Sequence, residues 1–265
     1  MKIFLTFLVI MLVTFIIYIC LSKIYDKFEY HQIKKDDKKV RLFWTGGFDS
    51  TARLCQLLIE EKKTVYPLYI EFNLDNDDPN ALWVRQNKEQ EKDSMKQIRK
   101  ALYKQFPYTK KLLKKTKFIK DKKTDPNYIQ KFLEMNLFPK KRKIHQYVYL
   151  SNYAYKLKDY IEIGVLGIHQ KSKFADFLKN NLIKEDENFK VAGKNPMECI
   201  KFPLYNKTKE DLYKRAKDNN YDNILNMSWS CWFPQSGKPC GLCPMCKERI
   251  VSHPESTTES TTESK

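Results

Sequence analysis

Residues 40–51 read VRLFWTGGFDST, and they decide the fold of this chain. The first six predict a buried strand that runs directly into the pair Gly46-Gly47. Between residues 50 and 60 the apolar residues recur at helical spacing, which predicts a helix. Backbone amides and the helix dipole bind anions where a helix begins after such a turn. A glycine pair followed by Asp-Ser also occurs as a mere turn, but the flanking strand and helix favour a phosphate-binding loop.

The rest of the chain alternates strands with helices. Four further segments have the composition of strands and four have the periodicity of helices. This alternation predicts an α/β fold with a parallel, doubly wound sheet that is covered on both faces. The predicted strands are 64–72, 115–121, 160–167 and the short edge strand 199–205, and the predicted helices are 83–105, 144–157, 173–183 and 207–217.

The loop residues have chemistry that suits a nucleotide phosphate. Gly46 and Gly47 let the backbone approach a pyrophosphate closely, and the hydroxyls of Ser50 and Thr51 can donate hydrogen bonds to it. Asp49 can help to hold a Mg²⁺ ion that bridges phosphate oxygens. The Walker pattern G-x-x-x-x-G-K-[ST] does not occur in the chain, so a different class of phosphate loop is indicated.

Four cysteines near the C-terminus form a second motif. Cys231, Cys240, Cys243 and Cys246 have the spacing C-x8-C-x2-C-x2-C, and four thiolates in so short a window can surround one Zn²⁺ ion. A shell of four sulfurs leaves no open coordination position, which predicts a structural site. Two disulfides or a C-x-x-C redox pair are the alternatives, and the two nested C-x-x-C units argue against a redox pair.

The formal net charge of +17 comes almost entirely from lysine. Such an excess is compatible with an ordinary solvated surface. It also fits attraction to RNA, to anionic lipid or to nucleotide phosphates.

The N-terminal residues predict a membrane anchor. Residues 3–21 carry no charged side chain and are long enough to nearly cross a hydrocarbon core. Lysine-rich residues 23–38 follow as a charged linker, so the positive-inside bias predicts a single-pass membrane protein whose C-terminal domain faces the cytosol. The anchor would occupy residues 1–22, and the repetitive tail 252–265 is expected to be disordered.

Together, the two motifs resemble those of one family. The run TGGFDST resembles the S-G-G-x-D-S signature of PP-loop ATP pyrophosphatases, and the added C-terminal cysteine cluster resembles the 7-cyano-7-deazaguanine synthases. Arg142 resembles the arginine of that family's P-G-R-N segment. Leu166-Gly167 and Lys209 also match family features. The resemblance covers a predicted domain of residues 39–251.

The chain departs from the family pattern at several positions. Thr45 replaces the first serine of the signature and keeps a hydroxyl, whereas Phe48 replaces a polar residue. The P-G-R-N segment has lost its glycine and asparagine around Arg142. Of the family's D-x-S-G-Y-P-D stretch, only Asp176 remains. These segments shape the substrate pocket in the family, so the resemblance supports ATP chemistry better than it supports the acceptor.

The resemblance implies an enzyme that uses ATP, Mg²⁺ and Zn²⁺ to convert 7-carboxy-7-deazaguanine and ammonia to 7-cyano-7-deazaguanine through an adenylated intermediate. It assigns Thr45, Gly46, Gly47, Ser50 and Thr51 to the phosphates and Asp49 to the magnesium ion, with Arg142 and Lys209 contacting phosphate or substrate carboxylate. Three alternatives stay open: a PP-loop enzyme that modifies tRNA, a deazapurine ligase that acts on protein, and an inactive, membrane-tethered nucleotide-binding module. A nucleic-acid partner and a homodimer are also left open.

Overall fold

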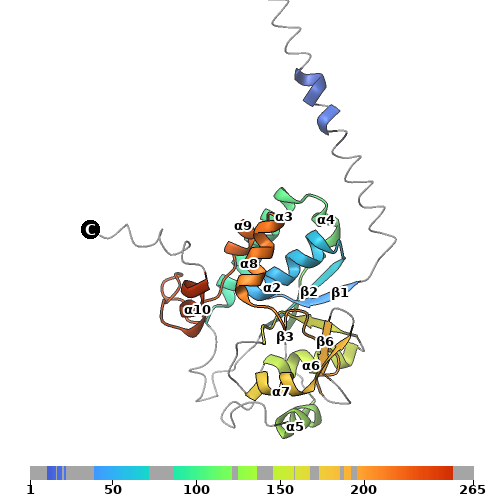
Figure 1. Ribbon diagram of the computed structural model, residues 1–265, viewed down its shortest axis with the longest axis vertical. Coiled ribbons are helices and arrows are strands. Elements are labelled where there is room, and N and C mark those ends of the chain that lie inside the picture. Colours follow the sequence, from blue (N-terminus) through green and yellow to red (C-terminus); the bar gives the residue numbers. More distant parts are fainter. Residues whose placement is uncertain are drawn as a thin grey trace, which may run out of the picture.

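A computed structural model describes most of the chain between residues 39 and 252. The described residues are 11–15, 17–19, 21, 39–71, 86–120, 125–135, 146–157, 159–167, 173–185, 188–191 and 196–252. Within them, a single sheet runs through the middle of the molecule with helices on both faces (Figure 1). The predicted α/β architecture is therefore confirmed.

The sheet has seven strands in the order β3-β2-β1-β4-β7-β6-β5. The first five strands in this order are parallel, with Leu42 of β1 opposite Pro67 of β2 on one side and Glu162 of β4 on the other. The last two strands run antiparallel to their neighbours. The strands are β1 (Val40–Phe43), β2 (Val65–Glu71), β3 (Lys117–Lys120), β4 (Ile161–Ile163), β5 (Leu182–Glu185), β6 (Asn188–Val191) and β7 (Ile200–Lys201).

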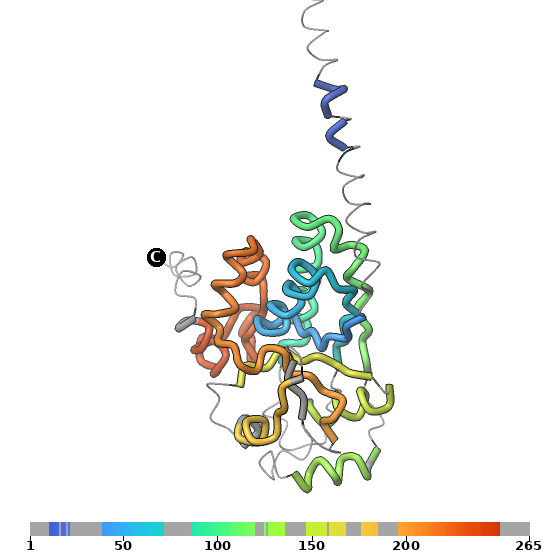
Figure 2. The backbone as a smooth tube through the Cα atoms, turned by 45° about the vertical axis from the view of Figure 1, so that its right-hand side comes forward, coloured from blue at the N-terminus to red at the C-terminus, as the bar shows by residue number. Residues whose placement is uncertain are grey.

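Helices cover the two faces with separate apolar cores. One face carries α2 (Phe48–Cys55), the π-helical turn η2 (Gln56–Glu60), α3 (Lys88–Gln105), α4 (Thr109–Leu112), α8 (Lys209–Asp218) and α9 (Asp222–Asn226). The other face carries α5 (Pro126–Glu134), α6 (Gln146–Leu157) and α7 (Lys173–Asn181). Figure 2 shows the C-terminal helices α8 and α9, in orange, beside the blue and cyan N-terminal elements. A final helix, α10 (Pro244–Ser252), follows the cysteines.

Helix α2 lies between the sheet and the outer helices. All of its residues are buried except Asp49, which keeps partial exposure. Arg53 makes a charged contact with the sheet: its Nε donates to Glu162 Oε2 at 2.7 Å in the middle of β4. Arg53 also donates to Gln56 at 3.3 Å and forms an ion pair with Glu61. The buried guanidinium is thus fully partnered, as burial of a charge requires.

The predicted membrane localisation is wrong. Among the described residues, no helix combines the length and the apolar character that a bilayer crossing needs. The sequence criterion counted uncharged residues, whereas a span requires one continuous helix of about 20 residues. The predicted orientation, with the C-terminal domain facing the cytosol, depended on that anchor and is therefore also wrong. Most of the predicted anchor, all of the linker 23–38 and residues 253–265 of the tail lie outside the described residues.

Two sequence predictions fail at one end of the sheet. The helix predicted over 173–183 ends at Asn181, because Leu182–Glu185 pairs with β6 as an antiparallel strand. Consequently the strand predicted as an edge, 199–205, is an internal strand of only two residues between β4 and β6. The sheet is mixed rather than wholly parallel.

Removal of Arg53 should destabilise the fold. We expect Arg53→Met to lower the free energy of unfolding by about 3–5 kcal/mol, because Glu162 would be left buried without its partner. Adding Glu162→Leu should recover most of the loss, since no orphaned charge then remains. Urea unfolding measures both variants, with Asp93→Ala at the exposed Asp93–Lys96 pair as the control that leaves the midpoint unchanged. A double variant as unstable as the single one would contradict this explanation.

Candidate active site

The glycine loop lies where the sheet reverses its strand order. Strand β1 has β2 on one side and β4 on the other, so the chain leaves β1 at a topological switch point. Ligands of open α/β sheets bind outside the carboxyl ends of the strands at such a point. Residues 44–47 connect the carboxyl end of β1 to the first turn of α2, and no side chain caps that turn. The predicted loop thus has the position that suits an anion.

Gly46 is held by two distant segments. Its carbonyl oxygen accepts from Trp229 N at 2.9 Å and lies 3.0 Å from Ser94 Oγ, which is also 2.9 Å from Met227 O. The residue has a φ of +72°, and a Cβ atom there would lie 2.8 Å from Glu91 O. Only glycine fits this backbone conformation in this space. The loop conformation therefore depends on α3 and on the segment that leads to the cysteines.

Gly164 brings β4 into direct contact with the start of α2. A Cβ atom on Gly164 would lie 2.9 Å from the carbonyl group of Asp49 and from Ser50 N. The sequence analysis did not single out this residue. A glycine that directly follows the buried run Ile161–Ile163 is the signal that could have found it, because glycine in such a place often marks a close backbone approach.

The loop hydroxyls differ in their surroundings. Thr45 Oγ1 accepts from Gly47 N at 3.3 Å and lies 3.4 Å from Ser50 Oγ, and Ser50 donates to Gly47 O at 3.2 Å. Thr45 and Ser50 thus lie together inside the loop. Thr51 is fully buried, and its hydroxyl accepts from Trp44 Nε1 at 3.2 Å. That hydroxyl therefore contacts the core instead of its loop neighbours.

Asp49 has a buried oxygen without a hydrogen-bond partner. Its Oδ1 atom finds none among the described residues. Burial raises the pKa of Asp49 to about 6, although the charge of Lys209 opposes the shift, and Glu248 adds to it. Lys209, the first residue of α8, has its Nζ 3.1 Å from Glu248 Oε2 on α10. An unpartnered carboxylate beside a lysine suits a cation bridged to phosphates.

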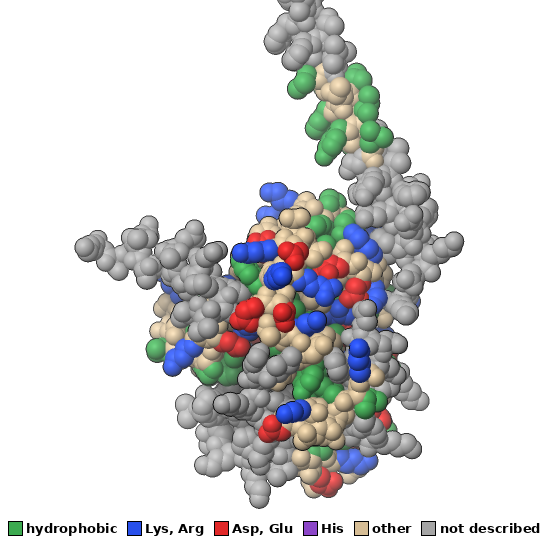
Figure 3. Space-filling view, viewed as in Figure 1, with side chains coloured by type: hydrophobic (Ala, Val, Ile, Leu, Met, Phe, Trp, Pro, Cys, Tyr) green, Lys and Arg blue, Asp and Glu red, His purple; other side chains and the backbone are tan. Residues whose placement is uncertain are grey.

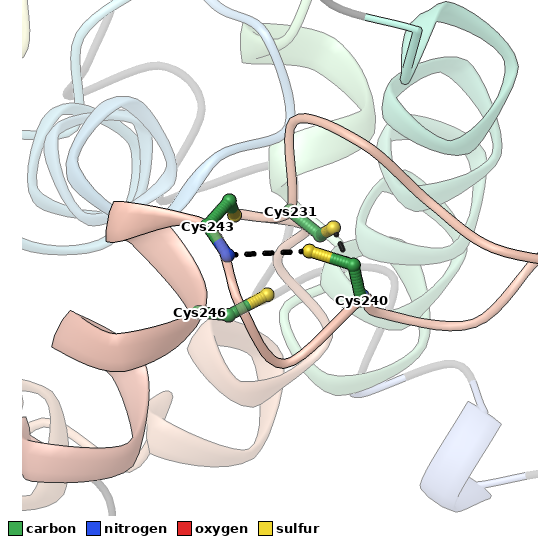
Figure 4. A group of neighbouring side chains, drawn as sticks. All are labelled: Cys231, Cys240, Cys243 and Cys246. Atoms are coloured by element: carbon green, nitrogen blue, oxygen red, sulfur yellow. Dashed lines mark hydrogen bonds between the residues drawn. The ribbon is translucent and has the colours of Figure 1, made fainter.

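The four cysteines converge, as Figure 4 shows. Their sulfur atoms all lie within 4.8 Å of one another. Cys240 N donates to Cys231 Sγ at 3.2 Å, and Cys243 N donates to Cys240 Sγ at 3.3 Å. The backbone N–H groups of Cys243 and Leu242 lower the pKa of Cys240 to about 7, whereas burial raises the pKa values of Cys231 and Cys246. This arrangement can bind a metal ion.

Helix α10 ties the cysteine cluster to the loop. Arg249 donates to Ser228 O at 2.7 Å and to Asn226 O at 2.9 Å. Ser228 directly precedes Trp229, whose amide donates to Gly46 O. Glu248, the neighbour of Arg249, forms the ion pair with Lys209. The cluster therefore supports both the loop and the lysine near Asp49. The sequence analysis singled out neither Glu248 nor Arg249.

Other predicted residues lie elsewhere. Arg142 is outside the described residues. Gly167 packs on Tyr205, since a Cβ atom there would lie 1.9 Å from the ring, and its amide donates to Tyr205 O at 3.0 Å. Asp176 is exposed on α7. The structure thus brings together Thr45, Gly46, Gly47, Asp49, Ser50 and Lys209, and it separates the Thr51 hydroxyl from them.

Neutralising Asp49 should stabilise the protein when nucleotide and metal are absent. Its pKa of about 6 lies some two units above that of an unfolded carboxyl, so above pH 6 its ionisation costs the folded state up to about 3 kcal/mol. We expect Asp49→Asn to raise the free energy of unfolding at pH 7. At pH 4 the difference should vanish, because the carboxyl is then protonated in the folded state.

Urea unfolding in chelator-treated buffer at both pH values tests this effect. Asp93→Asn, at an exposed position of α3, is the control and should change neither value. An Asp49→Asn variant less stable than the wild type at pH 7 would show that burial of the ionised Asp49 carboxylate does not destabilise the folded state.

Comparison with known proteins places the chain in a family. Two solved structures share a low level of similarity with it. One is the U34-tRNA thiolase NcsA from Methanococcus maripaludis with its [4Fe-4S] cluster. The two sequences are 12% identical, the match covers 89% of this chain and 76% of that chain, and the TM-score is 0.37. The other is a predicted subunit of a tRNA methyltransferase from Methanocaldococcus jannaschii. The two sequences are 12% identical, the match covers 72% of this chain and 92% of that chain, and the TM-score is 0.28.

Among proteins with curated functions, none matches the chain significantly. The family model described as "Queuosine biosynthesis protein QueC" matches residues 38–256, which include the glycine loop and all four clustered cysteines. The chain therefore belongs to the QueC family, the ATP-dependent ligases that synthesise 7-cyano-7-deazaguanine for queuosine.

Proposed function

We propose that the loop of residues 45–50 binds the phosphates of ATP and that Asp49 binds the Mg²⁺ ion of the nucleotide. One observation carries this proposal. The uncapped first turn of α2 and the unpartnered Oδ1 of Asp49 lie together at the switch point of the sheet. The helix start offers amide donors and a positive dipole to the phosphates. Mg²⁺ prefers oxygen ligands such as a carboxylate and the phosphates themselves.

The reaction requires two activations of the same carbon. The carboxylate of 7-carboxy-7-deazaguanine attacks the α-phosphorus of ATP, and pyrophosphate leaves. Ammonia then displaces AMP to give the amide, with loss of one proton. The amide oxygen attacks the α-phosphorus of a second ATP, and pyrophosphate leaves again. Elimination of AMP, which carries away the oxygen, and loss of the two amide protons leave the nitrile. The protein must position the reactants and offset charge on the phosphates, which are the two main contributions to phosphoryl and adenylyl transfer.

The chain has residues for both tasks. Thr45 and Ser50 shape the loop through their mutual contact, and we assign Thr51 a packing role against Trp44. Mg²⁺, when bound at Asp49, would neutralise part of the phosphate charge. Lys209 supplies a nearly buried ammonium, 13% exposed, whose charge acts on Asp49. We assign Lys209 to the phosphates, and the assignment of Arg142 to phosphate or substrate carboxylate stays a prediction from the family resemblance.

The cysteine cluster fits one zinc ion. Sulfurs at about 2.3 Å from a tetrahedral ion lie about 3.8 Å apart, and a slight contraction of the observed group satisfies this geometry. The four irons of a cubane cluster would need the sulfurs to spread further. Because α10 connects the cluster to Gly46 and Lys209, we propose a structural zinc that holds the active site together.

Loss of the Asp49 carboxylate should abolish synthesis. The full chain with ATP, Mg²⁺, ammonium and 7-carboxy-7-deazaguanine should form the nitrile, detected by mass. We expect Asp49→Asn to reduce kcat/KM at least about 100-fold, because the metal-bound phosphates lose their protein ligand. Lys209→Ala should act in the same direction.

Asp93→Asn, which removes an exposed carboxylate of α3 that pairs with Lys96, is the matched control and should keep the wild-type rate. Nitrile formation by Asp49→Asn at the wild-type rate would reject the proposed role. AMP release without nitrile from the wild type would point to another acceptor.

Removal of one clustered thiol should release the metal. Elemental analysis of the wild type should find one zinc per chain, and Cys243→Ser should lose most of it and melt at a lower temperature. Cys199→Ser is the matched control, since Cys199 lies outside the cluster and should retain the full zinc content. Iron instead of zinc in the wild type, or full zinc content in Cys243→Ser, would contradict the proposed site.

A further inference from the structure

The positive charge of the chain is concentrated in one segment. Residues 94–120 contain ten lysines and arginines and no aspartate or glutamate, although the whole chain has 32 acidic residues. On the face that carries α8 the signs are mixed, and Figure 3 shows blue and red side chains interspersed there. The segment runs from α3 through α4 to β3, so its charge belongs to one region of the fold.

The structure gathers this charge on one surface, here called the basic face: Lys96, Lys100, Lys104 and Lys115. The first three are exposed and lie four residues apart along α3, so they share one side of the helix. Lys115 is exposed in the connection between α4 and β3. Lys110 and Lys111 of α4, which belong to the same segment, are exposed as well. At one end of this face Lys96 pairs with the exposed Asp93 at 2.9 Å. Lysines clustered on one surface repel one another, and a bound anion relieves this repulsion.

A groove of about 590 Å³ adjoins the basic face between α3 and the edge strand β3. Lys96 and Arg99 of α3 line it, together with Lys115 of the connection that follows α4. Phe118 of the edge strand also lines it, and this ring is 47% exposed. The groove thus joins several cations to an accessible aromatic surface.

Hydrogen bonds of Arg99 hold one wall of the groove, residues 113–116. Arg99 donates to the carbonyl oxygens of Leu113 and Lys114 at 3.3 and 3.1 Å, and to Thr116 Oγ1 at 3.0 Å. It thereby fixes the connection that carries Lys115. The acidic side chain in the lining, Glu71, is paired with Lys92 at 2.6 Å. The groove wall therefore needs no rearrangement to present its remaining lysines.

We propose that the basic face and its groove bind a single-stranded nucleic acid. Lysine ammonium groups would contact the phosphates, and an unpaired base would stack on Phe118. Phosphodiester chains are recognised by this combination of a cationic track and an accessible aromatic ring. Trp44 and Met95 line the groove on the side of the glycine loop. The lysines and Phe118 belong instead to α3, to the connection after α4 and to β3, so the proposal goes beyond the ATP site that we propose at residues 45–50. A flat anionic lipid surface would use the lysines but not a recessed aromatic groove.

Fluorescence anisotropy with the full chain tests the proposal. The probes are a labelled 20-nucleotide RNA strand, the same sequence as DNA, and an RNA duplex. The wild type should bind the strands with an affinity that falls steeply with salt. The variant Lys96→Gln, Lys100→Gln, Lys104→Gln, Lys115→Gln should bind at least about tenfold more weakly at 100 mM salt. Its logarithmic salt slope should be smaller by about 3, which corresponds to four lost phosphate contacts.

A matched variant removes the same charge elsewhere. Lys131→Gln, Lys179→Gln, Lys184→Gln and Lys214→Gln replace exposed lysines on α5, α7, β5 and α8, and binding should stay near the wild-type value. Phe118→Ala should weaken strand binding about tenfold and leave duplex binding unchanged. Melting temperature and nitrile formation should be preserved in every variant, which verifies folding.

The outcomes are decisive in both directions. Tighter binding of RNA than of DNA identifies RNA as the ligand. Equal binding of the two strands shows that the protein contacts only phosphates and bases, which both strands share. Equal losses in the two four-lysine variants would overturn the proposal, because only net charge would then matter. So would preference for the duplex, or binding of phosphatidylserine vesicles without affinity for either strand.

Discussion

The carbonyl oxygen of Gly46 is the point on which the site depends. It is fixed by Ser94 of α3 and by the amide of Trp229, so residues from three distant parts of the chain determine one loop conformation. Neither contact involves the loop's own side chains. The positive φ at Gly46 and the tight space against α3 leave no room for another residue. A phosphate loop of this kind is therefore a tertiary structure, shaped by what surrounds its short glycine sequence.

The surrounding contacts also explain why the cysteine cluster belongs to the same domain. The cluster connects through Arg249 and Glu248 to the two features to which we assign nucleotide binding, the loop and Lys209. Within this frame, Asp49 is kept partly unsatisfied. Its unpartnered oxygen and raised pKa are costs to the folded chain, and such costs persist at sites where function needs them. Stability and chemistry thus oppose each other at one carboxylate.

The sequence predicted what is local. The strand, glycine turn and helix of residues 40–51 follow from periodicity, and the four cysteines meet because their spacing is short. Contacts across long stretches could not be predicted, as with Ser94 and Gly46 or Arg53 and Glu162, which are 109 residues apart. Helical periodicity at 182–183 was overridden by pairing of β5 with β6.

The most direct measurement is a crystal structure of the full chain with Mg²⁺ and a non-hydrolysable ATP analogue. We expect the phosphates to accept hydrogen bonds from backbone amides of residues 46–50, with the cation about 2.1 Å from an Asp49 oxygen. Gly46 should keep its contacts with Ser94 and Trp229 in that complex. A triphosphate bound away from this loop, or a cation that does not touch Asp49, would contradict the account.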